Sequence, residues 1–156
     1  MFPSVTGVAA TTTRRRRRPA PWLCLALLLG GCAPAAPELE ISDARVRAPI
    51  PGRDMTAGYF NVQNHGAEAV VLTGADSAAA RAVEMHLTTS DGGMMQMRRL
   101  DEVVVEAGDT VRFEPGGRHL MLFGVSSLGD GIDITLRRSN GEPIVARFTT
   151  VAVGEG

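Results

Sequence analysis

No cysteine lies after residue 32 of this 156-residue sequence. The two cysteines, Cys24 and Cys32, both fall in the N-terminal segment. The region that follows them therefore has no disulfide, no zinc–thiolate site and no cysteine nucleophile. Whatever chemistry this region performs has to use other side chains.

Lysine is absent as well. All sixteen basic residues are arginines, five of them form the run 14–18, and all seventeen acidic residues lie after Cys32. From Cys32 onward, eleven arginines are outnumbered by seventeen acidic residues, which gives a formal charge of −6. An acidic domain of this kind is a poor candidate for binding nucleic acid or an anionic membrane surface.

The sequence also lacks an apolar run long enough to span a bilayer as a helix, which takes about 20 residues. The run from Trp22 to Leu29 follows the arginines and precedes "GGC", an order typical of a secretory signal. The ending "LGGC" resembles a bacterial lipobox, the signal for cleavage before Cys32 and lipid attachment to it. The alternative is an ordinary cleaved signal that leaves Cys32 as a free thiol or removes it.

The lipoprotein interpretation divides the chain into three segments. We expect a signal peptide of the lipoprotein type at 1–31, a lipid-bearing tether rich in Pro and Ala at 32–40, and one domain at 41–153. The protein would be exported to the periplasm or cell envelope and held at the membrane only by the lipid on Cys32.

Sustained helical patterns are missing after the tether, where only residues 75–85 could form one turn of helix. Many short strands with turn signals every eight to twelve residues are typical of an antiparallel sandwich or barrel, so the expected fold class is all-β. The expected strands are 41–49, 57–66, 69–77, 82–90, 94–100, 102–113, 118–125, 130–141 and 143–153.

Methionine is concentrated in one stretch. Residues 84–100, "EMHLTTSDGGMMQMRRL", hold four of the seven methionines together with His86. Ten residues separate His86 from Met97, twenty-one separate Met97 from His119, and one separates His119 from Met121. His119 and Met121 would share one face of a strand, and a hairpin through 87–93 can bring His86 and Met97 beside each other.

Two thioethers and two imidazoles form a soft, neutral ligand set. Such a set suits Cu(I) better than zinc, calcium or magnesium, which prefer oxygen, nitrogen or thiolate. A blue-copper electron carrier is excluded, because that site needs a Cys thiolate. Thiols tend to oxidise outside the cytoplasm, whereas methionine avoids disulfide formation. Neutral ligands also hold the ion less tightly than thiolates, which favours a protein that gives its metal away.

Other residues of the same types have simpler interpretations. We expect His65 to be solvated in a turn, Met55 to lie in a loop or in the core, and Met85 to be part of the core. Met94 and Met95 stay undecided, although Met95 could offer a spare thioether at the rim of the site.

The charged residues near the candidate ligands have two interpretations. Arg98, Arg99 and Arg118 could steer an acidic partner, or they could simply form a solvated face. No nucleophile turn of a Ser–His–Asp triad is recognisable, and no carboxylate pair stands out, so we do not expect an enzyme.

The stretch 83–125, "VEMHLTTSDGGMMQMRRLDEVVVEAGDTVRFEPGGRHLMLFGV", resembles the periplasmic copper chaperone family PCu(A)C. The family signature is His, ten residues, Met, twenty-one residues, His, one residue, Met, and all four positions match here. "AGDTV", "PGGRHLML" and the upstream "AGYFNVQN" also match, so that the resemblance covers roughly residues 41–153. One departure is Val46, because the family often has an aromatic residue near the start of the domain.

The resemblance implies a cupredoxin-like β-sandwich that binds Cu(I) outside the cytoplasmic membrane. It carries over His86, Met97, His119 and Met121 as the copper ligands. It also implies delivery of copper toward subunit II of cytochrome c oxidase, sometimes with a Sco-type thiol partner. Copper storage or sensing, or a structural β-sandwich without metal, are the alternatives.

Overall fold

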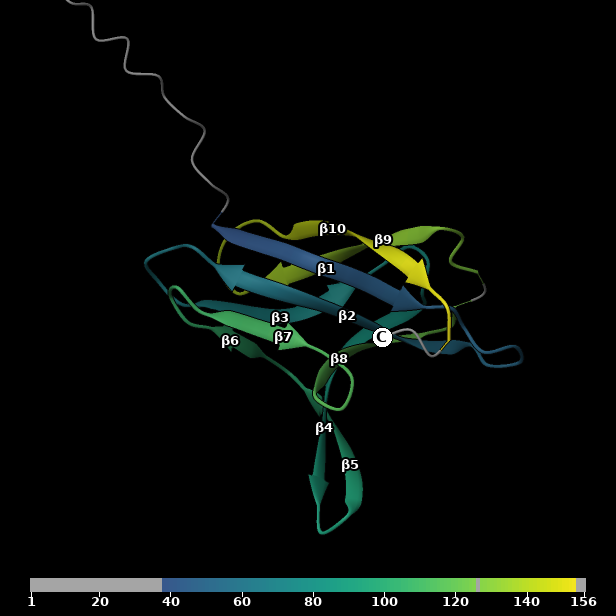
Figure 1. The fold of residues 1–156 in the computed structure, drawn as a ribbon. Helices are drawn as coiled ribbons and strands as arrows, with labels where there is room; N and C mark the ends of the chain where they lie inside the picture. The colour runs from purple at the N-terminus through teal and green to yellow at the C-terminus, as the bar shows by residue number, and fades with distance from the viewer. Residues whose placement is uncertain (1–37, 126, 154–156) are drawn as a thin grey trace, which may run out of the picture. The chain divides into compact units, whose positions relative to one another are not determined.

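The structure, a computed structural model, describes residues 38–125 and 127–153. The expected signal peptide, Cys32 and most of the expected tether lie outside these residues. The described part of the chain is built from strands, and it contains no helix long and apolar enough to cross a bilayer. Ten strands follow one another along the chain (Figure 1): β1 (Leu39–Arg47), β2 (Met55–Asn64), β3 (Val70–Asp76), β4 (Ala82–Asp91), β5 (Met94–Leu100), β6 (Val103–Val105), β7 (Thr110–Phe113), β8 (Arg118–Phe123), β9 (Gly131–Arg138) and β10 (Ile144–Val151).

Two differences from the expected strands change how the domain is built, and the other strand ends shift by at most three residues. Strand β1 begins at Leu39, inside the expected tether, because the Leu39 side chain is buried and its backbone pairs with Asn64. The expected strand 102–113 is divided into β6 and β7. A turn separates them, in which the Asp109 N–H donates to the Glu106 carbonyl over 3.0 Å and Gly108 takes a φ of +78°.

The strands form one continuous ladder that folds back on itself. The order is β5-β4-β8-β7-β2-β1-β10-β9-β3-β6, with additional pairing of β4 to β3 and of β8 to β2. Most pairs are antiparallel, as expected, but β1 pairs with β10 and β7 pairs with β8 in parallel. The β4–β3 pairing joins the two halves of the ladder, so the core lies between them.

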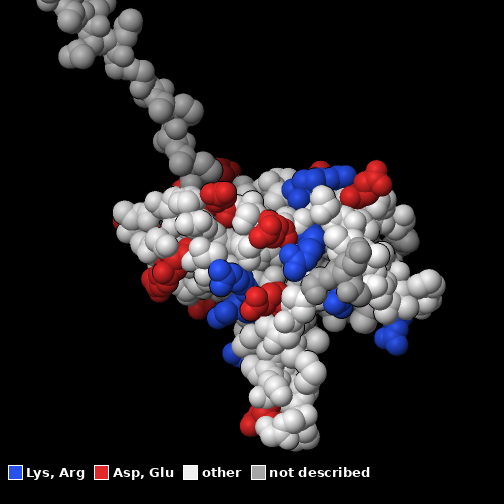
Figure 2. All heavy atoms as spheres, viewed as in Figure 1, with Lys and Arg blue, Asp and Glu red and all other residues white. Residues whose placement is uncertain are grey.

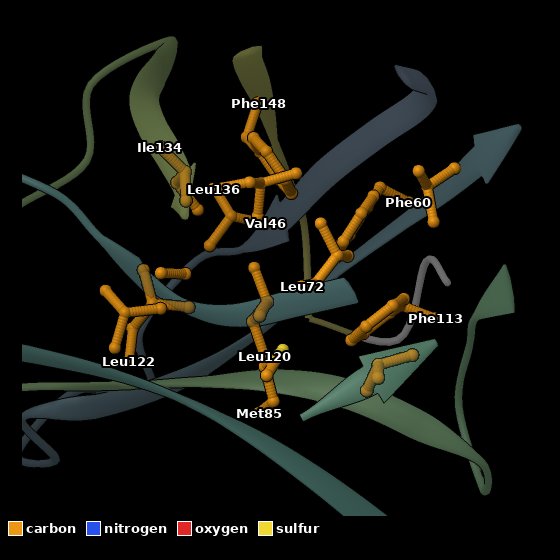
Figure 3. Packing of buried hydrophobic residues seen from close by; sticks show 14 of the residues in the cluster. Val46, Phe60, Leu72, Met85, Phe113, Leu120, Leu122, Ile134, Leu136 and Phe148 are labelled. Carbon is orange, nitrogen blue, oxygen red and sulfur yellow. The ribbon is translucent and has the colours of Figure 1, made fainter. Parts of the chain in front are cut away.

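Alternating apolar residues fill the space between the two halves (Figure 3). Phe60 on β2 stacks on Phe113 of β7 at a centroid distance of 4.3 Å and meets Phe148 of β10 edge to face at 5.6 Å. The side chains at 120 and 122 of β8 and Met85 of β4 also point into this core. Because side chains alternate along a strand, the residues between them, at 119, 121 and 86, point to the outer face.

Strands β4 and β5 form a hairpin that extends away from the other strands (Figure 1). Gly92 and Gly93 form its two-residue turn with φ values of +56° and +83°, the signs that a type I′ turn requires. Residues 89–99 of this hairpin are all exposed. In the view of Figure 2, its surface is mostly uncharged.

Candidate metal site

The pairing of β4 with β8 places His86 directly opposite His119. The centroids of the two imidazole rings are 5.9 Å apart, and the ring planes are inclined by 37°. The adjacent pair, Met85 and Leu120, points into the core, so the two histidines lie on the outer face. The register of the two strands thus brings together two residues that have 32 others, 87–118, between them in the sequence.

The two methionines of the candidate ligand set lie on the same outer face. Met121 follows His119 by two residues and lies opposite Ala57 of β2. Met97 of β5 lies opposite Thr88 of β4, which makes it a diagonal neighbour of His86. Diagonal neighbours on a sheet are within reach of long side chains. The expected hairpin therefore forms, although the residue directly across from His86 is Arg99.

Three of the four candidate ligands line a single surface pocket. Met97, His119 and Met121 contribute to its wall, and His86 lies beside His119 without being part of the lining. Met97 is 52% exposed, whereas His119 is only 6% exposed, so the pocket runs from a solvated methionine to a buried imidazole. The other lining residues are Arg47, Ala57, Tyr59, Thr88, Pro115 and Gly116.

His119 is held in one tautomer by its backbone contact. Its Nδ1 lies 3.1 Å from the carbonyl oxygen of Gly117, which can only accept, so Nδ1 carries the proton of the neutral ring. Burial lowers the pKa of His119 below the ordinary value of 6.5, and the charge of His86 lowers it further, while the Gly117 hydrogen bond opposes both. Because Nδ1 is protonated, the lone pair of Nε2 is available to a metal ion.

His86 is bound to an acidic neighbour on the same face. Its Nε2 lies 2.8 Å from Oε2 of Glu84, whose Oε1 accepts a hydrogen bond from Arg99 at 2.9 Å. The Nδ1 atom of His86 is buried and has no hydrogen-bond partner. A charged network therefore fixes one side of this ring and leaves the other nitrogen without a contact.

An arginine of β1, Arg47, also forms part of the pocket wall. Arg47 and Arg45 of β1 lie over the ring of Tyr59 at 5.5 and 5.6 Å from its centroid, within the range of cation–π attraction. The Nε atom of Arg47 is buried without a hydrogen-bond partner. The site thus has one fixed positive charge next to neutral donors.

The other histidine and three further methionines lie either in the core or at the surface. Met85 is in the core, as expected, at 2% exposure, and His65 is exposed, with Nε2 2.9 Å from Glu40. Met94 and Met95 are both solvent-exposed on β5. Met95 faces the same side of β5 as the ligand at 97, because residues two apart share a face.

The expectation that Met55 lies in a loop or in the core is wrong. It is the first residue of β2 and is 38% exposed. It shares a second pocket with Met121 and Arg47. The reason is its register opposite Phe123, which puts it on the outer face.

Only one of the three arginines expected to flank the ligands lies on their face. Arg98 and Arg118 are both paired with Leu87, so they share the opposite face of the sheet. Arg99 is on the ligand face, where it forms an ion pair with Glu84. The sequence neighbours of a ligand are therefore a poor guide to the charges around it.

Sequence reasoning assigned no role to Glu84, Arg47 or Tyr59. A signal for Glu84 was present, because a residue two before His86 on a strand shares its face. No local signal could have found Arg47 and Tyr59, since they reach the pocket through the pairing of β1 with β2 and of β2 with β8.

The chemistry of the site depends on thioether sulfur. Among the described residues, no group of three or more His, Cys, Asp or Glu side chains is placed to hold a metal ion. Met97 and Met121 lie on the same face as His86 and His119 and would add two thioether donors to the two imidazoles. This donor set fits a soft monovalent ion and does not fit calcium or magnesium.

The fold is that of the PCuAC domains. The protein superposes on the copper-bound PCuAC domain from PmoF2 with a TM-score of 0.63 at 24% identity, covering 76% of this chain and 96% of that one. It also superposes on the solution structure of CuI-DR1885 from Deinococcus radiodurans, with a TM-score of 0.62 at 28% identity, covering 79% of this chain and 84% of that one.

The sequence relatives identify the family. Residues 39–150 match the family described as "Putative lipoprotein LpqE-like", and the chain belongs to this LpqE-like family. A further relative is "Putative lipoprotein Lxx21020" of Leifsonia xyli subsp. xyli, which is 33% identical over 146 residues, covering 84% of this chain and 87% of the relative.

Proposed function

We propose that this protein is an exported copper carrier that binds Cu(I) through His86, Met97, His119 and Met121. The observation that supports it best is the convergence of these residues on one outer face. His86 lies opposite His119, and the other two line the same pocket as His119. Core packing does not account for this convergence, because Met97 is half exposed and His119 keeps a free Nε2 lone pair.

The chemistry of the donors favours the cuprous ion. Thioether sulfur is a soft donor and imidazole is a borderline one, and both suit Cu(I). All four donors are neutral, so the loaded site keeps the single positive charge of the ion. The solved structures named as copper-bound PmoF2 and CuI-DR1885 add independent support, since they share the fold of this protein. We propose that the site holds Cu(I) firmly enough for transport and loosely enough for release.

Release would occur by ligand exchange. A partner carrying thiolates would displace the thioethers first, because thiolates are charged and softer. Met97 is the ligand best placed for that exchange, since it lies on the projecting hairpin and is 52% exposed. The protein would then act without catalysing a covalent change, as a carrier and not as an enzyme.

We propose the copper centre of cytochrome c oxidase subunit II as the acceptor, directly or through a Sco-type thiol protein. This part of the proposal comes from the family resemblance alone. A purified soluble fragment of subunit II, with reduced thiols, is the direct test. Copper that stays on this protein in the presence of the reduced fragment would argue against delivery and for storage or sensing.

The location of the protein follows from its leader. We propose that the chain is cleaved before Cys32 and anchored by lipid at that residue, in keeping with the lipobox-like "LGGC" and with the name of its lipoprotein relative. Metabolic labelling with a radioactive or clickable fatty acid tests this. A Cys32→Ser variant should lose the label, and a label that persists would contradict the assignment.

The copper proposal is tested by loading the purified protein with Cu(I) and competing it against a chromogenic chelator. We expect one copper per chain, and a lower affinity for Met97→Ala and for His119→Ala. Met94→Ala is the matched control, because Met94 lies on the same strand but on the opposite face and is 68% exposed. Unchanged retention in both ligand variants would end the assignment and favour a structural β-sandwich.

A further inference from the structure

Glu84 determines which nitrogen of His86 is free to bind. We infer that Glu84 is a positioning residue that makes Nδ1, and not Nε2, the copper-binding atom of His86. The inference rests on the proposed function. Copper binding by itself does not determine whether Nδ1 or Nε2 of His86 is the ligand, and the inference concerns that choice. It starts from the 2.8 Å contact between His86 Nε2 and Glu84 Oε2.

The contact fixes the tautomer of the neutral ring. An ionised carboxylate can only accept a hydrogen bond, so the imidazole has to donate through Nε2–H. The remaining lone pair is then on Nδ1. In the structure this atom is buried and has no hydrogen-bond partner, which is a costly state for a polar atom unless another group uses its lone pair.

Arg99 holds the carboxylate in place. Its Nη1 donates to Oε1 of Glu84 at 2.9 Å, while Oε2 of the same carboxylate receives the imidazole N–H. The two oxygens are thus assigned to two different donors, and rotation of the carboxylate would break both contacts. Glu84 and His86 are also partly shielded, with side-chain exposures of 26% and 14%, so water competes weakly for these contacts.

The two histidines therefore keep different ring nitrogens free of hydrogen bonds to the protein. His119 donates from Nδ1 to the Gly117 carbonyl and keeps Nε2 free, whereas His86 donates from Nε2 and keeps Nδ1 free. In each case the hydrogen bond of one ring nitrogen selects the other as the ligand, which is the usual relation between a metal-binding histidine and its orienting partner. The centroid separation of 5.9 Å leaves room for one ion bonded at about 2 Å to each ring.

The decisive test uses nitrogen NMR, because Cu(I) is diamagnetic. Protein labelled with ¹⁵N in histidine is recorded before and after addition of one equivalent of Cu(I). Before loading, we expect Nε2 of His86 and Nδ1 of His119 to show the shifts of protonated nitrogens. On loading, the signals of His86 Nδ1 and His119 Nε2 should move, while His86 Nε2 stays protonated.

The outcomes separate the inference from the proposed function. If neither histidine responds to copper, the proposed function fails. If His119 Nε2 responds while His86 binds through Nε2, copper binding stands and the role assigned to Glu84 is wrong. If His119 responds and His86 shows no change at either nitrogen, the role of Glu84 is wrong as well.

Variants at Glu84 provide a second measurement. Glu84→Ala should lower the Cu(I) affinity about 10- to 100-fold, the usual effect of losing an orienting partner of a metal-bound histidine. It should also give a mixture of His86 tautomers in the copper-free protein. Glu84→Gln should keep the Nε2–H tautomer, because the amide oxygen can still accept, and should lose less affinity.

Glu106→Ala is the matched control. Glu106 is exposed in the turn between β6 and β7, on a part of the chain that does not line the pocket. It should change neither the affinity nor the histidine spectra. A loss of affinity in Glu84→Ala with an unchanged His86 tautomer would overturn the positioning role, because the effect would then come from charge alone.

Discussion

Met85 lies directly opposite Leu120 on the core side of β4 and β8, one step along the ladder from the opposed His86 and His119. Both apolar residues are almost completely buried, at 2% and 0% exposure. A slip of one residue between these strands would turn a histidine into the core and a core residue toward water. The packing of this apolar pair therefore holds the two imidazoles in register.

Leu120→Ala should destabilise the protein by about 2–5 kcal/mol, because it removes fully buried methyl groups and leaves a cavity. Denaturant unfolding of the copper-free protein measures the change. Val104→Ala, at a residue 42% exposed, serves as control and should change stability by about 0.5 kcal/mol or less. A loss below about 1 kcal/mol for Leu120→Ala would mean that the register has other supports.

Acid should weaken the copper-free protein through His119. Its pKa is lowered by burial, so the unfolded chain binds the proton more readily than the folded one. The contribution of this group to stability is thus present above the ordinary value of 6.5 and is lost as pH falls through the lower folded pKa. Unfolding curves at several pH values should show this decline, and His119→Gln should reduce it.

An NMR titration of the copper-free protein gives the same prediction at the level of one residue. The His119 ring signals should titrate below 6.5. A His119 midpoint at or above that of free histidine would contradict the burial described for this ring.

Arg47→Gln should raise the affinity for Cu(I). The guanidinium belongs to the pocket wall, and the bound ion would add a positive charge to a neutral donor set. A repulsion of about 1 kcal/mol between such charges corresponds to about a fivefold change in affinity. Chelator competition measures it, with Arg98→Gln on the opposite face as control, and an unchanged affinity would show that solvent screens the charge.

Oxidation with peroxide should separate ligand methionines from bystanders. Met94, Met95 and Met97 are exposed at 68%, 72% and 52%, so they should form sulfoxides quickly in the copper-free protein, while Met85 at 2% should resist. Bound Ag(I), a soft monovalent ion that stands in for Cu(I) and is not oxidised by peroxide, should protect Met97 and leave Met94 reactive. Peptide mass spectrometry resolves the sites, and equal protection of both residues would point to burial of the hairpin instead of ligation.

Much of the fold could be predicted because it follows from local alternation. Phe60 and Val62 are buried as the two-residue period of their strand requires, and His119 and Met121 share a face for the same reason. The break between β6 and β7 was missed because the apolar period runs through "EVVVEAGDTVRF" with only Gly108 to interrupt it. One glycine is a weak signal within such a pattern.

The contacts that could not be predicted come from pairings between distant strands. Nothing near His86 in the sequence indicates that it faces His119, since this depends on the β4–β8 register. The placement of Arg47 beside the pocket needs two successive pairings, β1 with β2 and β2 with β8. The position of Met55 was predicted wrongly for the same reason. The sequence around a methionine at the start of a strand does not show whether its side chain faces the core or the pocket.

Strand β5 stands at one end of the ladder and pairs only with β4, whereas β8 has β4 on one side and β2 with β7 on the other. Six of the seven side chains of β5 are exposed, so little holds this strand closed. Its amide protons should therefore exchange with solvent well before those of β8. Three of the four proposed donors, those on β4 and β8, would therefore lie on strands that open slowly. The fourth, Met97, would leave the ion whenever β5, the least protected strand, opens.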